Sequence, residues 1–524
     1  MASQNLIEAM LRPDFYPHDI TPAPELKQTH ISYIFIAGDY VYKIKKPVNF
    51  GFLDFTSLDK RRRYCLKELE LNKRLAPNVY LKVLPISRGD KGSYILGSKK
   101  NIVEYALKMR KLPEERMLKR LFAEGKADNS LMDAIARKVV SFHKQAATGG
   151  KIDKMGSLET ILHNHEENFA QTVSCIDATI PRNKYDFIKS YVHNFFDNNS
   201  KLFQRRIAEH KIRDCHGDLH LEHICITDEV VIFDCIEFNE RFRYEDVAAE
   251  TAFLAMDLDY NNYSDYANAF VAAYVRHSGD SGIFSLLNFY RCYYAYVRGK
   301  VISFRINDQS ISYEEQMLAT AAATRYFDLA YAYACRLEKP VLIIMAGLMG
   351  TGKSALAKVL ASYLGADIVR SDVLRKELLH IAPTSRRYND FGKGIYSDDI
   401  SRQTYDRAME IASEKIKNGK SIIIDASYKR MKDRLNAYEA AKKLSAGFYL
   451  LECTCPEEII KARLERRKLN HAEVSDGRWE IYLAQKANFE QISELPEEHH
   501  MVIDTSLDRE AYLDELIRRL KRRG

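Results

Sequence analysis

Gly347 to Ser354 are the residues of this chain whose spacing points most directly to chemistry. They read Gly-Leu-Met-Gly-Thr-Gly-Lys-Ser, which fits G-x-x-x-x-G-K-S, the pattern of a phosphate-binding P-loop. Glycines let the backbone wrap around phosphates, the lysine reaches the β- and γ-phosphates, and the serine hydroxyl holds Mg²⁺. We therefore expect ATP or GTP with Mg²⁺ as cofactors, with Ser354 as a metal ligand. The expected cofactor contacts are Gly347, Gly350, Thr351, Gly352, Lys353 and Ser354.

The residues on either side of this loop predict the elements that position it. Val341–Ala346 is an unbroken apolar run, typical of a buried strand, and Ala355–Leu360 has the composition of a helix. In the order strand, glycine loop and helix, the backbone N–H groups and the helix N-terminus point at an anion. The sequence therefore predicts a nucleotide site at the end of this strand.

Two aspartates downstream follow further strand-like runs. Asp372 comes two residues after one run, and Asp425 ends the apolar run Ser421–Ile424. Ligands of open α/β sheets bind at the carboxyl ends of the strands. We expect Asp372 to be the catalytic base for an attacking hydroxyl and Asp425 to be a metal ligand. Arg375 shares a helix face with Asp372, so we expect it to bind the substrate through an acceptor phosphate.

A charged segment, Glu457–Arg467, predicts a lid helix over the phosphates. Arg463 and Arg467 are four residues apart and share one helix face, so both are expected to contact the nucleotide. Arg466 is expected to be a solvated surface residue. Residues 475–478 are expected to form a lid loop.

A second set of polar residues, far upstream, also suits phosphoryl transfer. His216-Gly217-Asp218 opens a strand-rich block, and Asp234 follows an apolar pair after the next hairpin. One carboxylate of such a pair deprotonates or orients the acceptor hydroxyl, and the other holds Mg²⁺. Glu237 follows shortly after and is expected to contact the substrate.

The N-terminal pattern of His216-Gly217-Asp218 with Asp234 resembles the aminoglycoside phosphotransferase family, whose fold is that of the protein kinases. The resemblance spans about residues 30–310. It implies that Asp218 is the catalytic base and Asp234 the metal ligand. It also implies that Lys43 binds the α- and β-phosphates and pairs with Glu68 on the next helix.

The same resemblance implies further positions. Lys45 lies on the same strand face as Lys43, so the choice between these two lysines stays open. Residues 103–106 would form the hinge that meets the adenine. Asp246 and Glu250 would brace the catalytic loop.

One position departs from this family. The fifth residue after the catalytic aspartate is normally an asparagine that binds a second Mg²⁺, and here it is His223. Imidazole is a poorer Mg²⁺ ligand than an amide or carboxylate oxygen. With His223 as a metal ligand, this half is expected to be slow, to use one metal, or to have lost catalysis. His220 and His223 could alternatively form a transition-metal pair, although no third ligand stands nearby at zinc-like spacing.

Arg291–Lys300 mixes aromatic and basic residues. The segment could line an acceptor pocket, but an amphipathic core helix with basic residues at solvent positions is favoured.

The C-terminal pattern resembles the P-loop kinases grouped around polynucleotide kinase, zeta toxin and the AAA_33 family, over about residues 340–510. The spacing of Asp372 and Arg375 is similar to the acceptor-site motif of polynucleotide 5′-hydroxyl kinases. The whole chain is similar to bacterial fusions of an aminoglycoside phosphotransferase domain with a P-loop kinase domain.

The elements that must hold these residues divide the chain in two. A length of 524 residues is too long for one hydrophobic core. Residues 1–338 are expected to form an α+β protein-kinase-like domain, with an N-lobe at about 25–110 and a helical C-lobe at about 111–338. Residues 339–524 are expected to form an α/β P-loop kinase domain with a parallel sheet, because strands and helices alternate there. Lys339-Pro340 marks the boundary, since proline ends the preceding helix.

Composition bounds the class of protein. Hydrophobic residues make up 46% and charged residues 29%, which is ordinary for a globular chain. No signal peptide and no apolar run of transmembrane length is visible.

The nine cysteines lack paired metal spacing and are expected to be free thiols in a reducing cytoplasm. The net charge of +7 is modest, and the basic tail Arg518–Arg523 is expected to be a solvated helix end rather than a nucleic-acid site.

Three functional hypotheses follow. The leading one is an enzyme with two kinase-like domains, of which the C-terminal one transfers the γ-phosphoryl group of ATP to a hydroxyl of a small molecule or nucleotide. The second is a polynucleotide 5′-hydroxyl kinase, which would make nucleic acid a partner. The third is a nucleotide-gated regulatory protein with a catalytically weak N-terminal domain.

Overall fold

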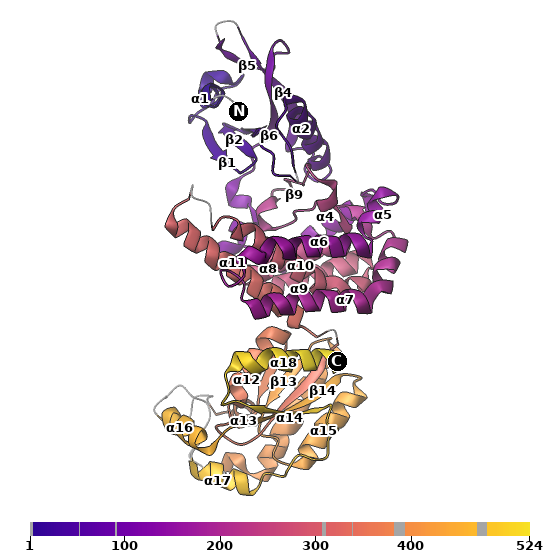
Figure 1. Ribbon diagram of the computed structural model, residues 1–524, viewed down its shortest axis with the longest axis vertical. Helices are drawn as coiled ribbons and strands as arrows, with labels where there is room; N and C mark the ends of the chain where they lie inside the picture. The colour runs from indigo at the N-terminus through magenta and orange to yellow at the C-terminus, as the bar shows by residue number, and fades with distance from the viewer. Residues whose placement is uncertain are drawn as a thin grey trace. The chain divides into compact units, whose positions relative to one another are not determined.

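The computed structural model describes residues 4–51, 53–89, 92–306, 311–337, 339–381, 394–468 and 479–523 (Figure 1). The chain divides into two compact units, Met1–Ala330 (unit 1) and Tyr331–Gly524 (unit 2). This division lies inside helix α11 (Tyr313–Cys335), before the expected boundary at Lys339-Pro340. The last turn of α11 packs with unit 2, where the Tyr331 hydroxyl donates to Asp514. Helix α11 thus ends at Cys335, ahead of Pro340, and the division by packing lies earlier still.

Unit 1 begins with a six-stranded antiparallel sheet in the order β1-β2-β3-β6-β4-β5. Strands β2 and β3 form a hairpin around Gly38, whose φ of 60° suits the tight turn. The strands are β1 (Glu25–Gln28), β2 (Ser32–Ala37), β3 (Tyr40–Lys45), β4 (Tyr80–Arg88), β5 (Tyr94–Leu96) and β6 (Ile102–Arg110).

Helix α2 (Leu58–Asn72) packs on one face of this sheet. Ser57 caps it by accepting from the backbone N–H of Lys60. Its buried residues include Arg61, Cys65, Glu68 and Asn72, whose spacing of four and three residues places them on one helix face. The opposite face of the sheet is covered by α1 (Gln4–Met10) and the turn Pro13–Phe15, which pack with Tyr42 and Ile44 of β3. Because side chains alternate along β3, Lys43 and Lys45 point to the α2 side.

The rest of unit 1 is mainly helical, as expected. Two short antiparallel sheets interrupt the helices: β7 (Ile212–Asp214) pairs with β10 (Tyr244–Asp246), and between them in sequence the hairpin β8 (Ile224–Ile226) pairs with β9 (Val230–Ile232). The helices are α3 (Leu118–Ala123), α4 (Asn129–Gln145), α5 (Lys151–Met155), α6 (Leu158–Thr172), α7 (Arg182–Ala208), α8 (Val247–Tyr260), α9 (Ser264–Ser278), α10 (Phe284–Ser303) and α11, with single 3₁₀ turns at Glu114–Arg116, Val173–Cys175, Leu221–His223, Glu240–Phe242 and Ser281–Ile283.

Unit 2 is built on a five-stranded parallel sheet in the order β12-β13-β11-β14-β15. Its central strands are buried on both faces, which explains their unbroken apolar sequences. The strands are β11 (Val341–Ala346), β12 (Asp367–Arg370), β13 (Ile422–Asp425), β14 (Gly447–Thr454) and β15 (His500–Asp504).

Helices cover both faces of this sheet (Figure 1). Alternate strand residues, among them Leu342 and Ile344, pack against α14 and α15 in one core. On the other face Tyr449 of β14 donates its hydroxyl proton to the Leu520 carbonyl of α18. The helices are α12 (Lys353–Leu364), α13 (Ser371–Leu378), α14 (Asp398–Lys417), α15 (Met431–Lys443), α16 (Glu457–Lys468), α17 (Trp479–Ala487) and α18 (Arg509–Arg523), with a 3₁₀ turn at Gly394–Tyr396.

The expected architecture is confirmed: unit 1 has an antiparallel-sheet lobe followed by a mainly helical lobe, and unit 2 is a parallel-sheet α/β unit that contains the P-loop. Among the described residues, no helix combines the length and apolarity that crossing a membrane requires.

Candidate functional site

The P-loop of unit 2 has the backbone geometry that phosphate binding requires. It connects β11 to α12, and Gly347, Gly350 and Gly352 have φ values of 122°, 83° and 88°. A Cβ on Gly347 would lie 2.4 Å from the carbonyl oxygen of Cys453, so no other residue fits there. No hydrogen bond from the backbone N–H groups of Gly350 and Gly352 occurs within the described residues, which leaves these donors available to a phosphate.

The side chains of the loop lie over its own backbone. Lys353 Nζ donates to the carbonyl of Leu348 at 2.7 Å, and the Thr351 hydroxyl donates to the same carbonyl at 2.8 Å. Lys353 and Ser354 begin α12, so both stand at the positive end of the helix dipole. A triphosphate and its metal fit this set of donors.

The carboxyl edge of the sheet brings together residues that are far apart in sequence. Asp425 ends β13, and its carboxylate lies 3.4 Å from Nε of Arg370, which ends the neighbouring β12. The Ser371 hydroxyl donates to the Asp425 carbonyl at 3.2 Å. Asp372 stands in the first turn of α13, next to this edge. The predicted base and metal ligand therefore lie at the ends of adjacent strands.

Arg375 contacts Asp372 directly. Its Nη1 donates to Oδ1 of Asp372 at 3.2 Å, and the arginine side chain is only 8% exposed, against 31% for the aspartate. The structure thus places Arg375 as a partner that orients Asp372. Its predicted contact with an acceptor phosphate stays a prediction.

The lid helix α16 places Arg463 beside the P-loop. Its guanidinium donates to the Thr505 carbonyl at 2.8 Å, to the Thr505 hydroxyl at 3.1 Å and to the Gly350 carbonyl at 3.4 Å. Arg466 is exposed on the same helix. The side chain of Arg467 and the predicted lid loop at 475–478 lie outside the described residues.

Three P-loop neighbours were not predicted. Thr505 donates to the Thr351 carbonyl at 2.6 Å, and Gln485 accepts from the backbone N–H of Met349 at 3.0 Å. Trp479 stacks on Tyr482 and packs against the cluster that contains Leu348 and Met349. Thr505 follows a predicted strand, so its place at the carboxyl edge could have been found from sequence. The α17 residues carry no such signal.

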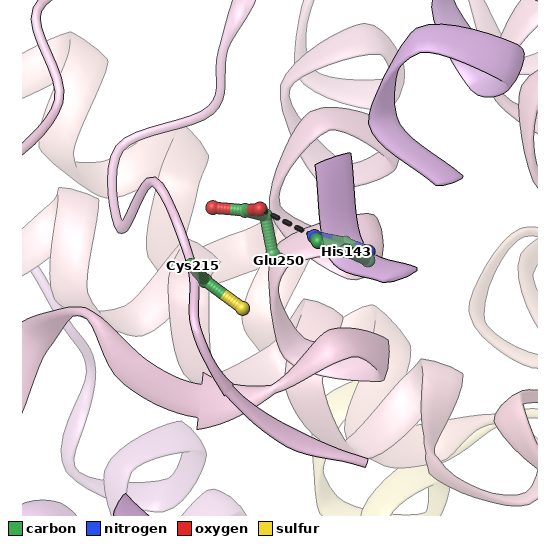
Figure 2. Close-up of side chains that lie close together, drawn as sticks. All are labelled: His143, Cys215 and Glu250. Atoms are coloured by element: carbon green, nitrogen blue, oxygen red, sulfur yellow. Dashed lines mark hydrogen bonds and ion pairs between the residues drawn. The ribbon is translucent and has the colours of Figure 1, made fainter. Parts of the chain in front are cut away.

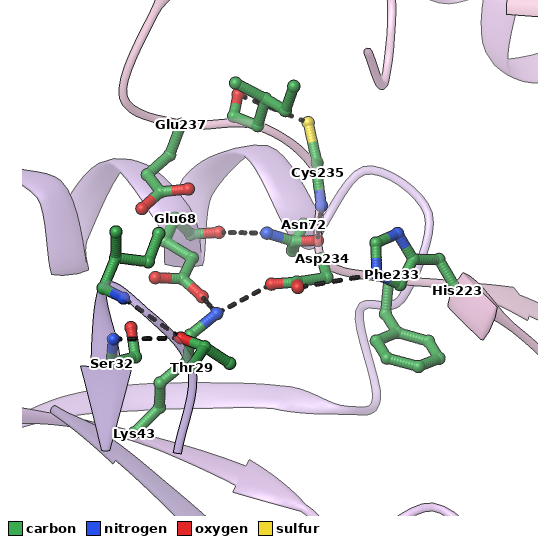
Figure 3. A network of polar contacts seen from close by, with 12 residues as sticks. Thr29, Ser32, Lys43, Glu68, Asn72, His223, Phe233, Asp234, Cys235 and Glu237 are labelled. Carbon is green, nitrogen blue, oxygen red and sulfur yellow. Dashed lines mark hydrogen bonds and ion pairs between the residues drawn. The ribbon is translucent and has the colours of Figure 1, made fainter. Parts of the chain in front are cut away.

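In unit 1, Lys43 lies between two carboxylates from different segments (Figure 3). Its Nζ is 2.8 Å from Glu68 of α2 and 2.7 Å from Asp234, which follows β9. Burial acts to lower the pKa of Lys43, but Asp234 and Glu68 raise it well above its usual value, so this lysine is charged. Both lysines contact Glu68 and Lys43 also contacts Asp234, which favours Lys43 as the lysine that binds phosphates; that role stays a prediction.

Lys45 belongs to a deeper ion-pair cluster. Its Nζ is 2.7 Å from Glu68 and also contacts Glu237, and its side chain is 1% exposed. Burial raises the pKa of Glu237, and the nearby Lys45 opposes that shift. Glu237 was predicted to bind substrate, but this carboxylate is buried against a lysine, so we assign it to holding Lys45.

Glu250 of α8 connects the loop at His216-Gly217 to His143, and Figure 2 shows its side chain beside those of His143 and Cys215. One carboxylate oxygen accepts from the backbone N–H groups of His216 and Gly217 at 2.6 and 2.8 Å. The other lies 2.6 Å from Nε2 of His143, whose Nδ1 is 2.7 Å from the Tyr274 hydroxyl. Glu250 braces the loop, as the family resemblance implies. His143, Cys215 and Glu250 lie together, but both Glu250 oxygens already have partners, which disfavours a metal ion there.

Asp246 caps α8 by accepting from the N–H of Ala248 at 2.8 Å. It also forms a buried ion pair with Arg206, whose second carboxylate partner is Asp280. These contacts fix the start of the helix that carries Glu250.

The carboxylate of Asp218 lies between two histidines. Its Oδ2 lies 3.5 Å from Nδ1 of His223 and 3.6 Å from Nε2 of His220. Burial acts to raise the pKa of Asp218, but the two histidines lower it below its usual value, so the carboxylate is ionised. Burial lowers the pKa of His223. Asp218 therefore lies beside His220 and His223 as a third side chain with a possible metal-ligand atom. The sequence spacing had not indicated such a third group.

The expected hinge at residues 103–106 is not confirmed by the structure. Residues 103–106 lie inside β6, and Glu104 there pairs with Arg61 at 2.9 Å, so they are not a hinge. The sheet is instead connected to the helices by the segment after Arg110, because β6 continues to that residue.

The mixed aromatic and basic segment Arg291–Lys300 lies within the core helix α10, as the favoured interpretation predicts, but its basic residues are not at solvent positions: Arg291 is buried, and Arg298 and Lys300 are half-buried. Arg291 pairs with Asp259 at 3.5 Å. Arg298 differs from its neighbours. Its positive charge acts on Asp218 and, together with the two histidines, lowers the pKa of that carboxyl group.

Comparisons with known proteins agree with the division of the chain. Residues 342–492, which lie within unit 2, match the AAA_33 family, described as an AAA domain. The chain is 29% identical over 453 residues to uncharacterized proteins of Mycobacterium tuberculosis and Mycobacterium bovis, covering 86% of this chain and 88% of each relative.

Solved structures with remote similarity come from kinases. A choline/ethanolamine kinase family protein from Mesorhizobium loti covers 63% of this chain and 98% of its own, at 12% identity and a TM-score of 0.36. A sugar kinase from Janibacter covers 35% of this chain and 94% of its own, at 19% identity and a TM-score of 0.27.

Proposed function

We propose that the chain is an ATP-dependent phosphotransferase with two separate active sites, and that the unit 2 site phosphorylates a hydroxyl of a small molecule or nucleotide. The observation that carries this proposal is the convergence at the carboxyl edge of the unit 2 sheet. The P-loop, Asp372, Asp425 and the lid residue Arg463 come from four segments and meet at that edge. A loop that only hydrolysed ATP would not need a base oriented by a buried arginine.

Each residue at the unit 2 site has a role that its geometry supports. The N–H groups of Gly350 and Gly352 and the ammonium of Lys353 bind the phosphates. Arg463 stabilises charge on the transferring group from the lid side. Asp372, held by Arg375, accepts the proton of the attacking hydroxyl. Ser354 and Asp425 would hold Mg²⁺, which when bound neutralises phosphate charge.

The unit 1 site supports the same type of reaction. Lys43, held between Glu68 and Asp234, is placed to bind the α- and β-phosphates. Asp218 is ionised and partly exposed, which suits a base for a second acceptor hydroxyl. Asp234 and His223 would hold the metal.

The test is a screen of acceptor hydroxyls with the purified full-length chain, read as transfer of labelled γ-phosphate from ATP. Asp372→Asn and Asp218→Asn separate the two sites. We expect each acceptor to lose transfer by ~100-fold or more in one variant and to keep it in the other. Transfer that is unchanged in both variants would refute the assignment of the two bases.

The polynucleotide 5′-hydroxyl kinase remains the alternative, because Asp372 and Arg375 do share a helix face and touch. The burial of Arg375 makes a small acceptor the better proposal. A 5′-hydroxyl oligonucleotide belongs in the same screen, and efficient labelling of its 5′ end would favour the alternative. A regulatory chain would bind ATP at both sites and label no acceptor.

A further inference from the structure

The two carboxylate oxygens of Asp234 face different partners (Figure 3). Oδ1 is 2.7 Å from Nζ of Lys43, whereas Oδ2 is 3.7 Å from Nε2 of His223. His223 belongs to the 3₁₀ turn Leu221–His223, and Asp234 follows the neighbouring strand β9. One oxygen is thus neutralised by lysine, and the other is turned toward an imidazole nitrogen.

The hydrogen bond on the opposite side of the His223 ring defines its tautomer. Nδ1 lies 2.9 Å from the backbone carbonyl oxygen of Asp218. A carbonyl oxygen can only accept, so Nδ1 carries the proton and Nε2 of the neutral ring carries the lone pair. A histidine that ligates a metal typically donates its other N–H to a carboxylate or backbone carbonyl in this way. The Nε2 lone pair of His223 therefore points toward Asp234 as a ligand would.

The distance between these two atoms suits a shared metal ion. Two ligands about 2.0–2.2 Å from one ion lie about 2.8–3.6 Å apart at octahedral or tetrahedral angles. The observed 3.7 Å is within a few tenths of an ångström of that range. A small closure of either side chain would complete the pair.

His220 is not part of this ligand pair. Its Nδ1 accepts from the backbone N–H of Glu222 at 3.3 Å, so its Nε2 bears the proton that faces Asp218. His220 thereby acts as a donor beside the base. Asp218 is left for the acceptor hydroxyl, which keeps the metal and the base on separate residues.

The donor atoms differ between the two sites of the chain. At the P-loop, Ser354 and Asp425 offer oxygen atoms, the ligands that Mg²⁺ prefers. In unit 1 one of the two donors is nitrogen. First-row transition-metal ions accept mixed nitrogen and oxygen ligands, whereas Mg²⁺ binds imidazole poorly.

We propose that the unit 1 site takes a first-row transition-metal ion in preference to Mg²⁺, bound through Nε2 of His223 and Oδ2 of Asp234. This inference rests on the proposed function, because the ion is bound together with the nucleotide phosphates. His223 is then a selective ligand rather than a sign of lost activity. The two sites of one chain respond to different metal ions.

The experiment uses the full-length chain with Mn²⁺ and a non-hydrolysable ATP analogue, observed by pulsed electron paramagnetic resonance. The histidines are labelled with ¹⁵N, so that coupling from a histidine ligand is distinguished from adenine nitrogen. We expect one bound Mn²⁺ to show ¹⁵N coupling and a second, at the P-loop, to show none. Competition with Mg²⁺ measures the preference of each site.

Two variants give the matched comparison. His223→Asn replaces the nitrogen ligand with an amide oxygen, and we expect it to remove the ¹⁵N coupling and to lower the Mn²⁺-over-Mg²⁺ preference by roughly tenfold or more. His220→Asn changes a histidine in the same loop and should keep the coupling. Thermal unfolding of both variants checks that unit 1 is folded.

The outcomes separate the inference from the function on which it rests. Two bound nucleotides and two Mn²⁺ ions without ¹⁵N coupling would overturn the metal assignment and leave the two-site function standing. Coupling that persists in His223→Asn, or that is lost in His220→Asn, would also overturn it. A single bound nucleotide, located at the P-loop, would overturn the unit 1 function and this inference together.

Discussion

Single residues in this chain owe their roles to partners that are distant in sequence. Lys43 and Lys45 are two residues apart on one strand face, yet one meets Asp234 and the other Glu237. Lys43 is partly accessible at 12% exposure, and Lys45 is enclosed at 1%. Lys43 is therefore accessible to a ligand, whereas Lys45 is suited to stabilising the fold of unit 1.

Substitution of the two lysines should separate these roles. Lys45→Met leaves Glu237 as a buried carboxylate without its cation, which should lower the free energy of unfolding of unit 1 by ~3–5 kcal/mol. Lys43→Met should cost less stability, because Asp234 is more exposed, but should abolish nucleotide binding in unit 1. Hydrogen exchange of β3 and α2 reports the first effect, and equilibrium binding reports the second. Equal destabilisation by both variants would contradict this division.

The lid arginines provide a second comparison at residue scale. Arg463→Ala should lower phosphoryl transfer by the unit 2 site by ~100-fold or more, because a donor beside the P-loop is lost. Arg466→Ala, on an exposed position of the same helix, is the control and should leave the rate unchanged. The measurement is kcat with a saturating acceptor. A similar loss in both variants would mean that the helix, rather than the Arg463 guanidinium, is responsible.

At the scale of elements, the helical lobe of unit 1 encloses a histidine among aromatic rings. His165 of α6 contacts Phe196 of α7 and Phe289 and Tyr293 of α10. Burial lowers the pKa of His165 to about 3, with a minor contribution from His193. Three helices thus pack around a ring that must stay neutral.

This packing predicts acid sensitivity with a defined sign. Above pH ~6.5 the ring is neutral in both states, so His165 adds no pH dependence. Between about pH 6.5 and 3 the unfolded chain binds a proton that the folded chain excludes, so stability should fall by about 1.4 kcal/mol per pH unit from this residue. His165→Phe should remove that part of the slope. Denaturant unfolding of unit 1 at pH 7, 6 and 5 measures it, and parallel slopes for both proteins would contradict the prediction.

At the scale of the whole molecule, the chain has one tryptophan, and it lies in unit 2 beside the P-loop. Trp479 packs against the cluster that includes Leu348 and Met349. Unit 1 contains none. Tryptophan fluorescence therefore reports on one of the two proposed nucleotide sites.

Trp479 fluorescence and the number of bound nucleotides should together distinguish the two proposed sites. Wild-type protein should bind two nucleotides, and Trp479 fluorescence should change with only one of them. Lys353→Ala should abolish the fluorescence change and leave one nucleotide bound, while Lys43→Met should keep the change and also leave one bound. Calorimetry gives the stoichiometry. A fluorescence change that survives in Lys353→Ala would show that Trp479 does not report the P-loop site.

Local sequence was sufficient for the strands, the helices and the P-loop. The hairpin around Gly38, the α2 helix and the parallel strands of unit 2 follow from periodicity and turn residues, which act over a few positions. The hinge was misplaced because an apolar segment within a long strand looks the same as one at its end. The sequence places the boundary at Lys339-Pro340, whereas the compact units divide after Ala330, within α11. The contact of Tyr331 with Asp514 joins residues that are far apart in sequence, so a local pattern does not reveal it.

By itself, the sequence determined the two fold classes and the residue types able to transfer a phosphoryl group, since spacing and polarity are local properties. Only the tertiary structure decided which lysine meets Asp234, that Glu237 is buried, that Arg375 holds Asp372, and that the Nε2 lone pair of His223 faces a carboxylate. Each of these depends on which segments pack together, because the free energy of a charge is set by neighbours that the chain supplies from elsewhere.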